Sequence, residues 1–213
     1  MQKTIIFDMD GTLLYTLKDL QYAVNKALEK FGYPIKTIEE IQSFVGDGVK
    51  KLIERALPSG LENLDYPLVF QEFILQYENN ADKYTKPYDD ILLVLNELKK
   101  RNYKLGVNSN KYDSAVKFLC KKYFPQIDCA IGARDGIDVK PSPIGALDVL
   151  NTLNGQPEKC YFVGDSDIDI KTAKNAGFIS VGVTWGYRSK QSLIDAGARF
   201  IIDNPLELLE ICK

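Results

Sequence analysis

Short apolar segments that end in polar residues recur along the chain. Residues 3–7 are mostly apolar and are followed at once by Asp8, which is the pattern of a buried strand that ends in a loop. The same pattern predicts further strands at residues 103–107, 128–131, 160–163, 179–183 and 200–202. Helix-length stretches with apolar residues three and four positions apart lie between these strands, as at residues 91–98 and 115–120. The alternation predicts an α/β fold, a doubly wound parallel sheet with helices on both faces.

The stretch from Thr16 to Asp82 interrupts this alternation. It holds no convincing strand and predicts four consecutive helices, the second of which begins with a capping box formed by Thr37 and Glu40. We therefore expect a helical cap domain at residues 16–83, inserted into a discontinuous core domain. That core domain would consist of residues 1–15 and 84–213.

Composition limits the partners of the protein. Of 213 residues, 45% are hydrophobic and 26% are charged, so the chain can bury a true core. A formal net charge of −2 provides no basic field for nucleic acid or for an anionic lipid surface. The chain has no apolar run of about 18 residues and no signal-peptide core. We expect a cytoplasmic protein that binds neither nucleic acid nor membranes, and a monomer and a dimer fit the sequence equally well.

The residue types that are absent limit the chemistry further. The sequence contains no histidine, which excludes Ser-His-Asp and Cys-His mechanisms and metal binding by imidazole. The four cysteines form no Cys-x-x-Cys pair, which favours buried reduced thiols over a zinc site or a disulfide framework. Any catalysis must therefore depend on carboxylates, hydroxyls, amines and thiols.

Two pairs of acidic residues follow predicted strands. Asp8 and Asp10 come directly after the first strand, and Asp165 and Asp169 follow the strand at residues 160–163. Two carboxylates about 4 Å apart repel by roughly 4 kcal/mol at an effective dielectric constant near 20, which a divalent cation or a shared proton offsets. Mg²⁺ prefers such hard oxygen ligands. We expect a magnesium site where the carboxyl ends of these strands meet, although each pair alone also fits a solvated turn or a helix N-terminus.

Four motifs occur in order at the ends of predicted strands. They are Asp8-Met9-Asp10-Gly11-Thr12, Ser109 with Asn110, Lys140 in Lys140-Pro141-Ser142-Pro143, and Gly164-Asp165-Ser166-Asp167-Ile168-Asp169. This set resembles the haloacid dehalogenase-like superfamily, specifically its phosphatase branch with a helical C1-type cap inserted after the first motif. The resemblance spans nearly the whole chain and implies a Mg²⁺-dependent phosphatase.

The resemblance also implies a role for each motif residue. Asp8 would attack phosphorus and become an aspartyl phosphate, Asp10 would protonate the leaving alcohol and then activate water, and Lys140 would pair with Asp8 and a phosphate oxygen. The groups that would bind the phosphate are on Gly11, Thr12, Ser109 and Asn110. The metal would be held by Asp8, the Asp10 carbonyl and Asp165, with Asp169 as a further ligand or as the group that orients Lys140.

The substrate is less defined than the reaction. The loop of Gly46, Asp47 and Gly48 in the predicted cap resembles that of phosphoglycolate phosphatases, and it would let backbone amides approach a small phosphorylated metabolite. The segment Thr184-Trp185-Gly186-Tyr187 shares this likeness, but Tyr15 stands where that family has an aspartate. Pyrophosphate, a nucleoside monophosphate or a sugar phosphate is an alternative substrate. A phospho-acceptor regulatory module is the non-enzymatic alternative.

Overall fold

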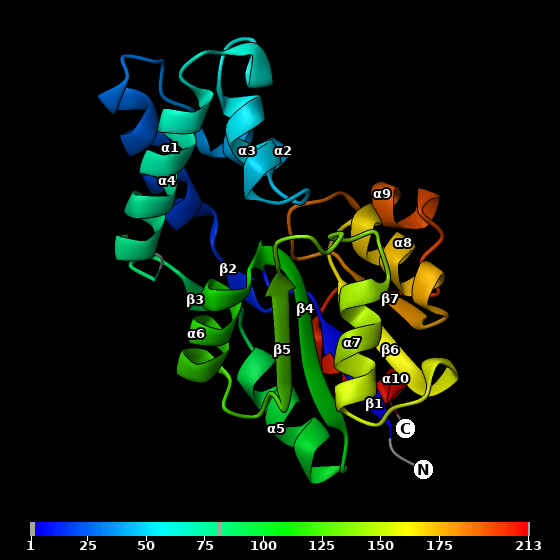
Figure 1. The fold of residues 1–213 in the computed structure, drawn as a ribbon. Helices are drawn as coiled ribbons and strands as arrows, with labels where there is room; N and C mark the ends of the chain where they lie inside the picture. The colour runs from blue at the N-terminus through cyan, green and yellow to red at the C-terminus, as the bar shows by residue number, and fades with distance from the viewer. Residues whose placement is uncertain (1–2, 81, 213) are drawn as a thin grey trace. The chain divides into compact units, whose positions relative to one another are not determined.

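The computed structural model describes residues 3–80 and 82–212. The chain divides into two compact units, one formed by Met1–Leu14 with Pro87–Lys213 and the other by Tyr15–Lys86. Figure 1 shows the first unit as a sheet flanked by helices and the second as a group of helices. A two-stranded sheet of β2 (Leu14–Tyr15) and β3 (Lys86–Pro87) contains both points at which the chain passes from one unit to the other.

The first unit is built on a six-stranded sheet in the order β5-β4-β1-β6-β7-β8. Every pair of neighbouring strands is parallel. The strands are β1 (Thr4–Phe7), β4 (Lys104–Tyr112), β5 (Cys129–Ala133), β6 (Cys160–Gly164), β7 (Ile179–Val183) and β8 (Phe200–Ile202). The predicted α/β fold with a parallel sheet is confirmed.

Helices cover both faces of this sheet. They are α5 (Ile91–Lys100), α6 (Asp113–Tyr123), α7 (Ile144–Thr152), α8 (Asp167–Ala176), α9 (Lys190–Asp195) and α10 (Leu208–Ile211), with short 3-10 turns η2 (Pro157–Lys159) and η3 (Pro205–Glu207). Because successive side chains of a strand point to opposite faces, Ile5 and Phe7 of β1 pack in the cluster that includes α5, α6 and α10. Ile6 packs with α7 and α8 on the other face.

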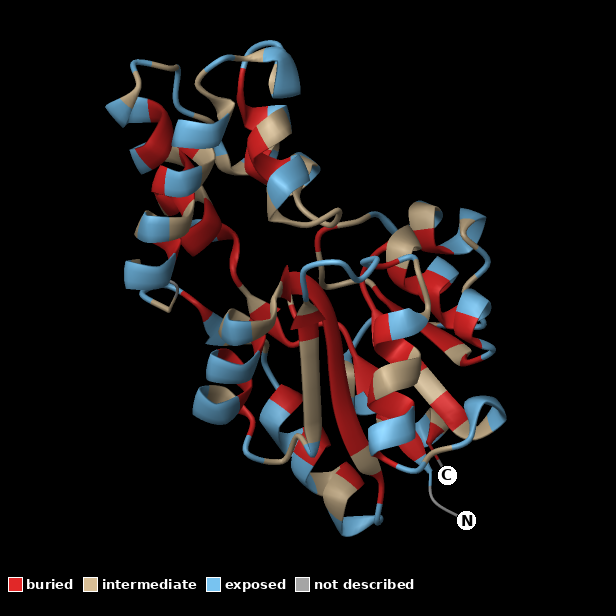
Figure 2. Ribbon diagram, viewed as in Figure 1, coloured by how far each residue is buried: buried red, intermediate tan, exposed pale blue. Residues whose placement is uncertain are grey.

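Strand β4 is longer than the sequence predicts. Its pairing with β1 ends at Phe7 opposite Val107, where the prediction ends the strand, but β4 continues along β5 to Tyr112 with a register shift after Asn108. Its polar residues stay extended because they are buried against neighbouring segments, and Figure 2 shows β4 buried along most of its length. Polarity alone does not end a strand whose side chains find partners inside the protein. The extension carries Ser109 and the two residues after it onto the carboxyl edge of the sheet.

The second unit is helical, as predicted. Its four helices are α1 (Leu17–Lys30), α2 (Ile38–Phe44), α3 (Val49–Ala56) and α4 (Tyr66–Asn80), with a 3-10 turn η1 (Gly60–Glu62) between the last two. The predicted capping box starts α2, since the Thr37 side chain accepts from Glu40 N and the Glu40 side chain accepts from Thr37 N. Apolar side chains of all four helices are buried.

The structure bears on the predicted state of the cysteines and on membrane-spanning helices. All four cysteines are free; Cys120, Cys160 and Cys212 are buried, whereas Cys129 is partly exposed. Within residues 3–80 and 82–212, no helix combines the length and the apolar character needed to cross a membrane.

Candidate active site

The loop after β1 is held by its own backbone. Asp8 N donates to Val163 O at 2.8 Å, which extends the ladder between β1 and β6 by one residue, and the amides of Leu13 and Leu14 both donate to Met9 O at 3.0 Å. Met9 and Leu13 are fully buried. The carboxylates that follow β1 therefore project from a turn that is anchored in the core.

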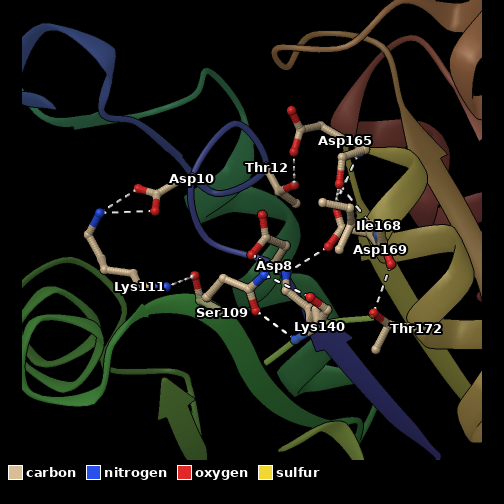
Figure 3. Close-up of polar contacts among 12 residues, drawn as sticks. Asp8, Asp10, Thr12, Ser109, Lys111, Lys140, Asp165, Ile168, Asp169 and Thr172 are labelled. Carbon is tan, nitrogen blue, oxygen red and sulfur yellow. Dashed lines mark hydrogen bonds and ion pairs between the residues drawn. The ribbon is translucent and has the colours of Figure 1, made fainter. Parts of the chain in front are cut away.

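Three buried carboxylates meet at this edge of the sheet. Oxygens of Asp8, Asp165 and Asp169 all lie within 4.8 Å of one another. Lys140 Nζ donates to Asp8 Oδ1 at 2.6 Å and to Asp169 Oδ1 at 2.7 Å (Figure 3). Three of the four predicted metal residues are thus brought together around the predicted lysine. The fourth, Asp10, directs its carboxylate elsewhere.

Electrostatics show that this cluster lacks positive charge. Burial raises the pKa of Asp8 to about 7, against the opposing effect of Lys140, and burial and the charge of Asp169 raise the pKa of Asp165 well above its ordinary value. Burial alone would lower the pKa of Lys140, but Asp169 and Asp8 raise it above its ordinary value. One ammonium faces three carboxylates, and all the acidic ligand atoms are hard oxygens. This donor set fits a divalent cation.

The Asp169 side chain caps a helix and also pairs with the lysine of the acidic cluster. Its Oδ2 accepts hydrogen bonds from Ser166 Oγ at 2.6 Å and from Ser166 N at 3.1 Å, and Ser166 Oγ accepts from Asp169 N. This capping box starts α8, while the other carboxylate oxygen receives Lys140. The Asp169 carboxylate therefore caps α8 with one oxygen and pairs with Lys140 through the other, and its role toward a metal stays a prediction.

Asp165 is enclosed by two loops. Its Oδ2 accepts from Tyr187 N at 2.6 Å, and Thr12 Oγ1 donates to its Oδ1 at 3.4 Å. Trp185 Nε1 donates to Thr12 O at 3.0 Å and so connects the two loops. Gly186 lies so close to Asp165 that a side chain there would overlap the carboxylate. The likeness to phosphoglycolate phosphatases in Trp185-Gly186-Tyr187 did not predict this role.

The extended end of β4 places two predicted site residues. Ser109 and Asn110 are buried, and the side chain of Asn110 forms two hydrogen bonds with the backbone of Lys140. Lys140 N donates to Asn110 Oδ1 at 2.8 Å, and Asn110 Nδ2 donates to Lys140 O at 3.1 Å. Asn110 therefore fixes the backbone from which the Lys140 ammonium reaches the carboxylates.

Lys111 contacts a predicted catalytic residue, although no sequence motif indicated it. Its Nζ donates to both carboxylate oxygens of Asp10, at 2.8 and 2.9 Å, and Figure 3 shows the Asp10 carboxylate turned toward Lys111. Its backbone N donates to Ser109 Oγ at 3.3 Å. Its position directly after Ser109 and Asn110 was the available sign that Lys111 lies near the site. A lysine in a predicted loop, however, gives no indication that its side chain is buried.

Gly11 and Thr12 lie in the loop after β1, where the Gly11 amide donates to Leu14 O at 2.9 Å and is therefore already paired, and the Thr12 hydroxyl donates to Asp165. The remaining predicted substrate residues belong to the helical unit. Gly46 and Gly48 have φ values of +125° and +86°, which favour glycine, and α3 begins after Gly48. Asp47 pairs with Arg55 at 2.5 Å, and Arg55 also donates to Phe44 O at 2.8 Å. The loop is thus ordered within its own unit, and its contact with a substrate stays a prediction.

The chain belongs to the haloacid dehalogenase-like hydrolase family, whose sequence model matches residues 5–183. The phosphoglycolate phosphatase of Aquifex aeolicus is 33% identical over 214 residues, which are 98% of this chain and 96% of that protein. The phosphoglycolate phosphatase of Vibrio cholerae is 32% identical, with 98% and 96% covered. A solved structure from Lactobacillus delbrueckii subsp. bulgaricus, provisionally named phosphoglycolate phosphatase, matches with a TM-score of 0.93 and 34% identity over 99% of this chain and 98% of that one. The family predicted from the four motifs is confirmed.

Proposed function

We propose that this chain is a phosphatase that hydrolyses a small phosphomonoester through an aspartyl phosphate on Asp8. The observation that carries the proposal is the position of Asp8, buried beside Lys140 and within a cluster of three carboxylates. Lys140 holds Asp8 Oδ1, and we assign the attack on phosphorus to Oδ2. A carboxylate nucleophile needs no histidine, and the chain has none.

The reaction then proceeds in two steps. In the first, which Asp10 enters as the carboxylic acid, the bond from Asp8 Oδ2 to phosphorus forms, the bond to the leaving oxygen breaks, and Asp10 gives that oxygen its proton. In the second, Asp10 takes a proton from water, the water oxygen bonds to phosphorus, and the bond to Asp8 breaks. Inorganic phosphate leaves and both carboxylates return to their starting forms. The Ser109 hydroxyl and the Asn110 backbone amide are the proposed donors to the phosphoryl oxygens, whereas the Gly11 amide already donates to Leu14 O at 2.9 Å.

Mg²⁺ is the cation we propose for the acidic cluster. Asp8, Asp165 and the Asp10 carbonyl would hold it, with Asp169 as a further ligand or as the partner of Lys140. When bound, the ion would neutralise charge on the phosphoryl oxygens. Buried hard oxygens and a shortage of positive charge support this assignment.

Phosphoglycolate is the substrate we propose. Relatives that match this chain over nearly its whole length bear that name, and a small anionic ester suits a short glycine loop such as Gly46-Asp47-Gly48. We propose that residues 16–83 act as the cap domain of a core formed by residues 1–15 and 84–213, so that this loop selects the substrate. Pyrophosphate, nucleoside monophosphates and sugar phosphates remain the competing substrates to test.

A substrate panel tests the proposal. The purified protein is assayed with phosphoglycolate, pyrophosphate, nucleoside monophosphates and sugar phosphates, with Mg²⁺ and with EDTA, and the substrates are ranked by kcat/KM. We expect phosphoglycolate to rank first and EDTA to abolish turnover. A different leading substrate would replace the substrate assignment alone. Stable phosphorylation without turnover would instead favour the phospho-acceptor module.

A further inference from the structure

The Asp10 carboxylate is engaged by a buried lysine that no motif of the family likeness includes. Lys111 Nζ lies 2.8 Å from Oδ1 and 2.9 Å from Oδ2 of Asp10, so one ammonium holds both oxygens. The Lys111 side chain is 2% exposed and the Asp10 side chain 14%. This pair is therefore removed from solvent, unlike the ion pairs on the surface of the same unit, such as Lys117 with Asp113.

Stability alone is a weak reason to keep such a pair. Desolvation of two charges offsets much of their attraction, and a pair of apolar residues of similar volume is often at least as stabilising. Lys111 also lies at the carboxyl end of β4, beside Ser109, whose hydroxyl accepts from the Lys111 backbone. The charge is thus placed where the reacting groups of the proposed site meet.

The direction in which Lys111 draws Asp10 fits the proposed reaction. In phosphoryl transfer the attacking and leaving oxygens lie roughly in line on opposite sides of phosphorus. If Asp8 attacks, the group that protonates the leaving oxygen must lie on the far side of phosphorus from Asp8. Lys140 draws Asp8 toward Asp169, whereas Lys111 draws the Asp10 carboxylate away from that cluster (Figure 3).

We propose that Lys111 is a positioning residue, which holds the Asp10 carboxylate on the leaving-group side of the site. The inference rests on the proposed function, because it assigns proton transfer to Asp10. It goes beyond that function by adding a residue that sets the leaving-group chemistry. Substrates with a poor leaving group need the proton from Asp10 most, so they should depend most on Lys111.

The test compares leaving groups in Lys111→Met and Lys111→Arg. The value of kcat/KM reports the steps up to departure of the leaving group, and it is measured for phosphoglycolate and for p-nitrophenyl phosphate. We expect Lys111→Met to lower kcat/KM for phosphoglycolate about 10- to 100-fold, and for p-nitrophenyl phosphate less than ~3-fold. Lys111→Arg should recover part of the loss. Equal losses for both esters, or no loss for either, would overturn the proposal.

A matched control comes from the other end of the sheet. Lys99 Nζ also contacts both oxygens of an aspartate, Asp128, at 2.7 Å each. Lys99→Met breaks a pair in which one ammonium likewise contacts both carboxylate oxygens, although these side chains are 32% and 24% exposed and lie away from the site. We expect the ratio of the two kcat/KM values to stay at its wild-type value. A shift of this ratio like that of Lys111→Met would show that the leaving-group effect follows from lost stability, which would overturn the proposal.

A double variant covers the case in which Lys111→Met does not fold. Asp10→Asn with Lys111→Met removes both charges, so no unpaired charge is left in the interior. If Lys111 acts through Asp10, the double variant should hydrolyse phosphoglycolate within ~2-fold of Asp10→Asn alone. A further drop of 10-fold or more would contradict that coupling. If the wild-type protein hydrolyses neither ester, the proposed function fails and this inference fails with it.

Discussion

Gly186→Ala tests whether the loop around Asp165 maintains the acidic cluster. A Cβ atom at position 186 would lie 2.5 Å from the Gly11 carbonyl oxygen and closer still to Cβ and Oδ2 of Asp165. Ordinary contacts of a Cβ atom begin near 3.4 Å, so these atoms must move apart by about 1 Å. The neighbours are backbone and the stem of a short side chain, and neither can move without displacing the carboxylate.

The displacement sets the expected effect. Distances in a metal site tolerate changes of about 0.2 Å, and loss of a supporting contact typically costs 10- to 100-fold in affinity. We therefore expect Gly186→Ala to weaken Mg²⁺ binding by about 10- to 100-fold, with a loss of about 1–3 kcal/mol of folding stability from overpacking. Isothermal titration of the chelator-treated protein with Mg²⁺ measures the affinity without using activity.

The control is Gly32→Ala in the helical unit. Gly32 has a φ of +75° and no atom within 4 Å of an added Cβ, so alanine there strains the backbone without reaching the cluster. It should lose stability and keep its Mg²⁺ affinity. Should Gly186→Ala bind Mg²⁺ within ~2-fold of the wild type, the reasoning about Asp165 is refuted.

Three further variants test other parts of the account. Asn110→Ala leaves buried backbone groups of Lys140 without their side-chain partner. We expect a loss of about 1–3 kcal/mol of folding stability, measured by urea unfolding, and a reduced kcat; unchanged stability would contradict this. Gly48→Ala places a residue with a Cβ atom at a positive φ, which costs about 1–2 kcal/mol. It should raise KM for phosphoglycolate at least ~5-fold, and an unchanged KM argues against a role of the loop in binding. Although burial raises the pKa of Asp128, hydrogen bonds from Lys99 and Leu105 N bring it below its ordinary value, so this carboxylate stabilises the fold above pH ~4 and stops doing so as the pH falls through its folded pKa. Asp128→Asn should therefore cost about 1 kcal/mol at pH 7, and this deficit should shrink as the pH falls through the folded pKa of Asp128; a deficit that does not change with pH would refute the assignment.

The sheet and the main acidic residues could be predicted because they follow a simple rule. A short apolar run followed by a polar residue marks the carboxyl end of a buried strand, and in a parallel sheet those ends share one edge. Asp8 and Asp165 follow β1 and β6, so the rule places both at this edge, and the two carboxylates meet because β1 and β6 are neighbours in the sheet.

The contacts that complete the site could not be predicted in the same way. Lys111 is buried only because β4 continues past Val107, and that continuation depends on partners in β5 and on Asn110 rather than on local hydrophobicity. Tyr187 supports Asp165 through its backbone N–H, which every residue but proline possesses and which therefore leaves no sequence signal. Gly186, next to Tyr187, and Gly11 are visible signs of a close approach, because a Cβ atom at either position would overlap the Asp165 carboxylate.

If phosphorus bonds transiently to Asp8 during turnover, the phosphorylated protein can be trapped. Asp10→Asn is mixed with p-nitrophenyl phosphate and Mg²⁺, quenched in acid, digested, and analysed by mass spectrometry. The good leaving group allows the first step, while loss of the base slows the second, so the intermediate should accumulate. We expect one phosphoryl group on the peptide that contains Asp8, and none in a variant that also carries Asp8→Asn. A phosphoryl group on any other residue, or turnover by Asp8→Asn at the wild-type rate, would contradict it.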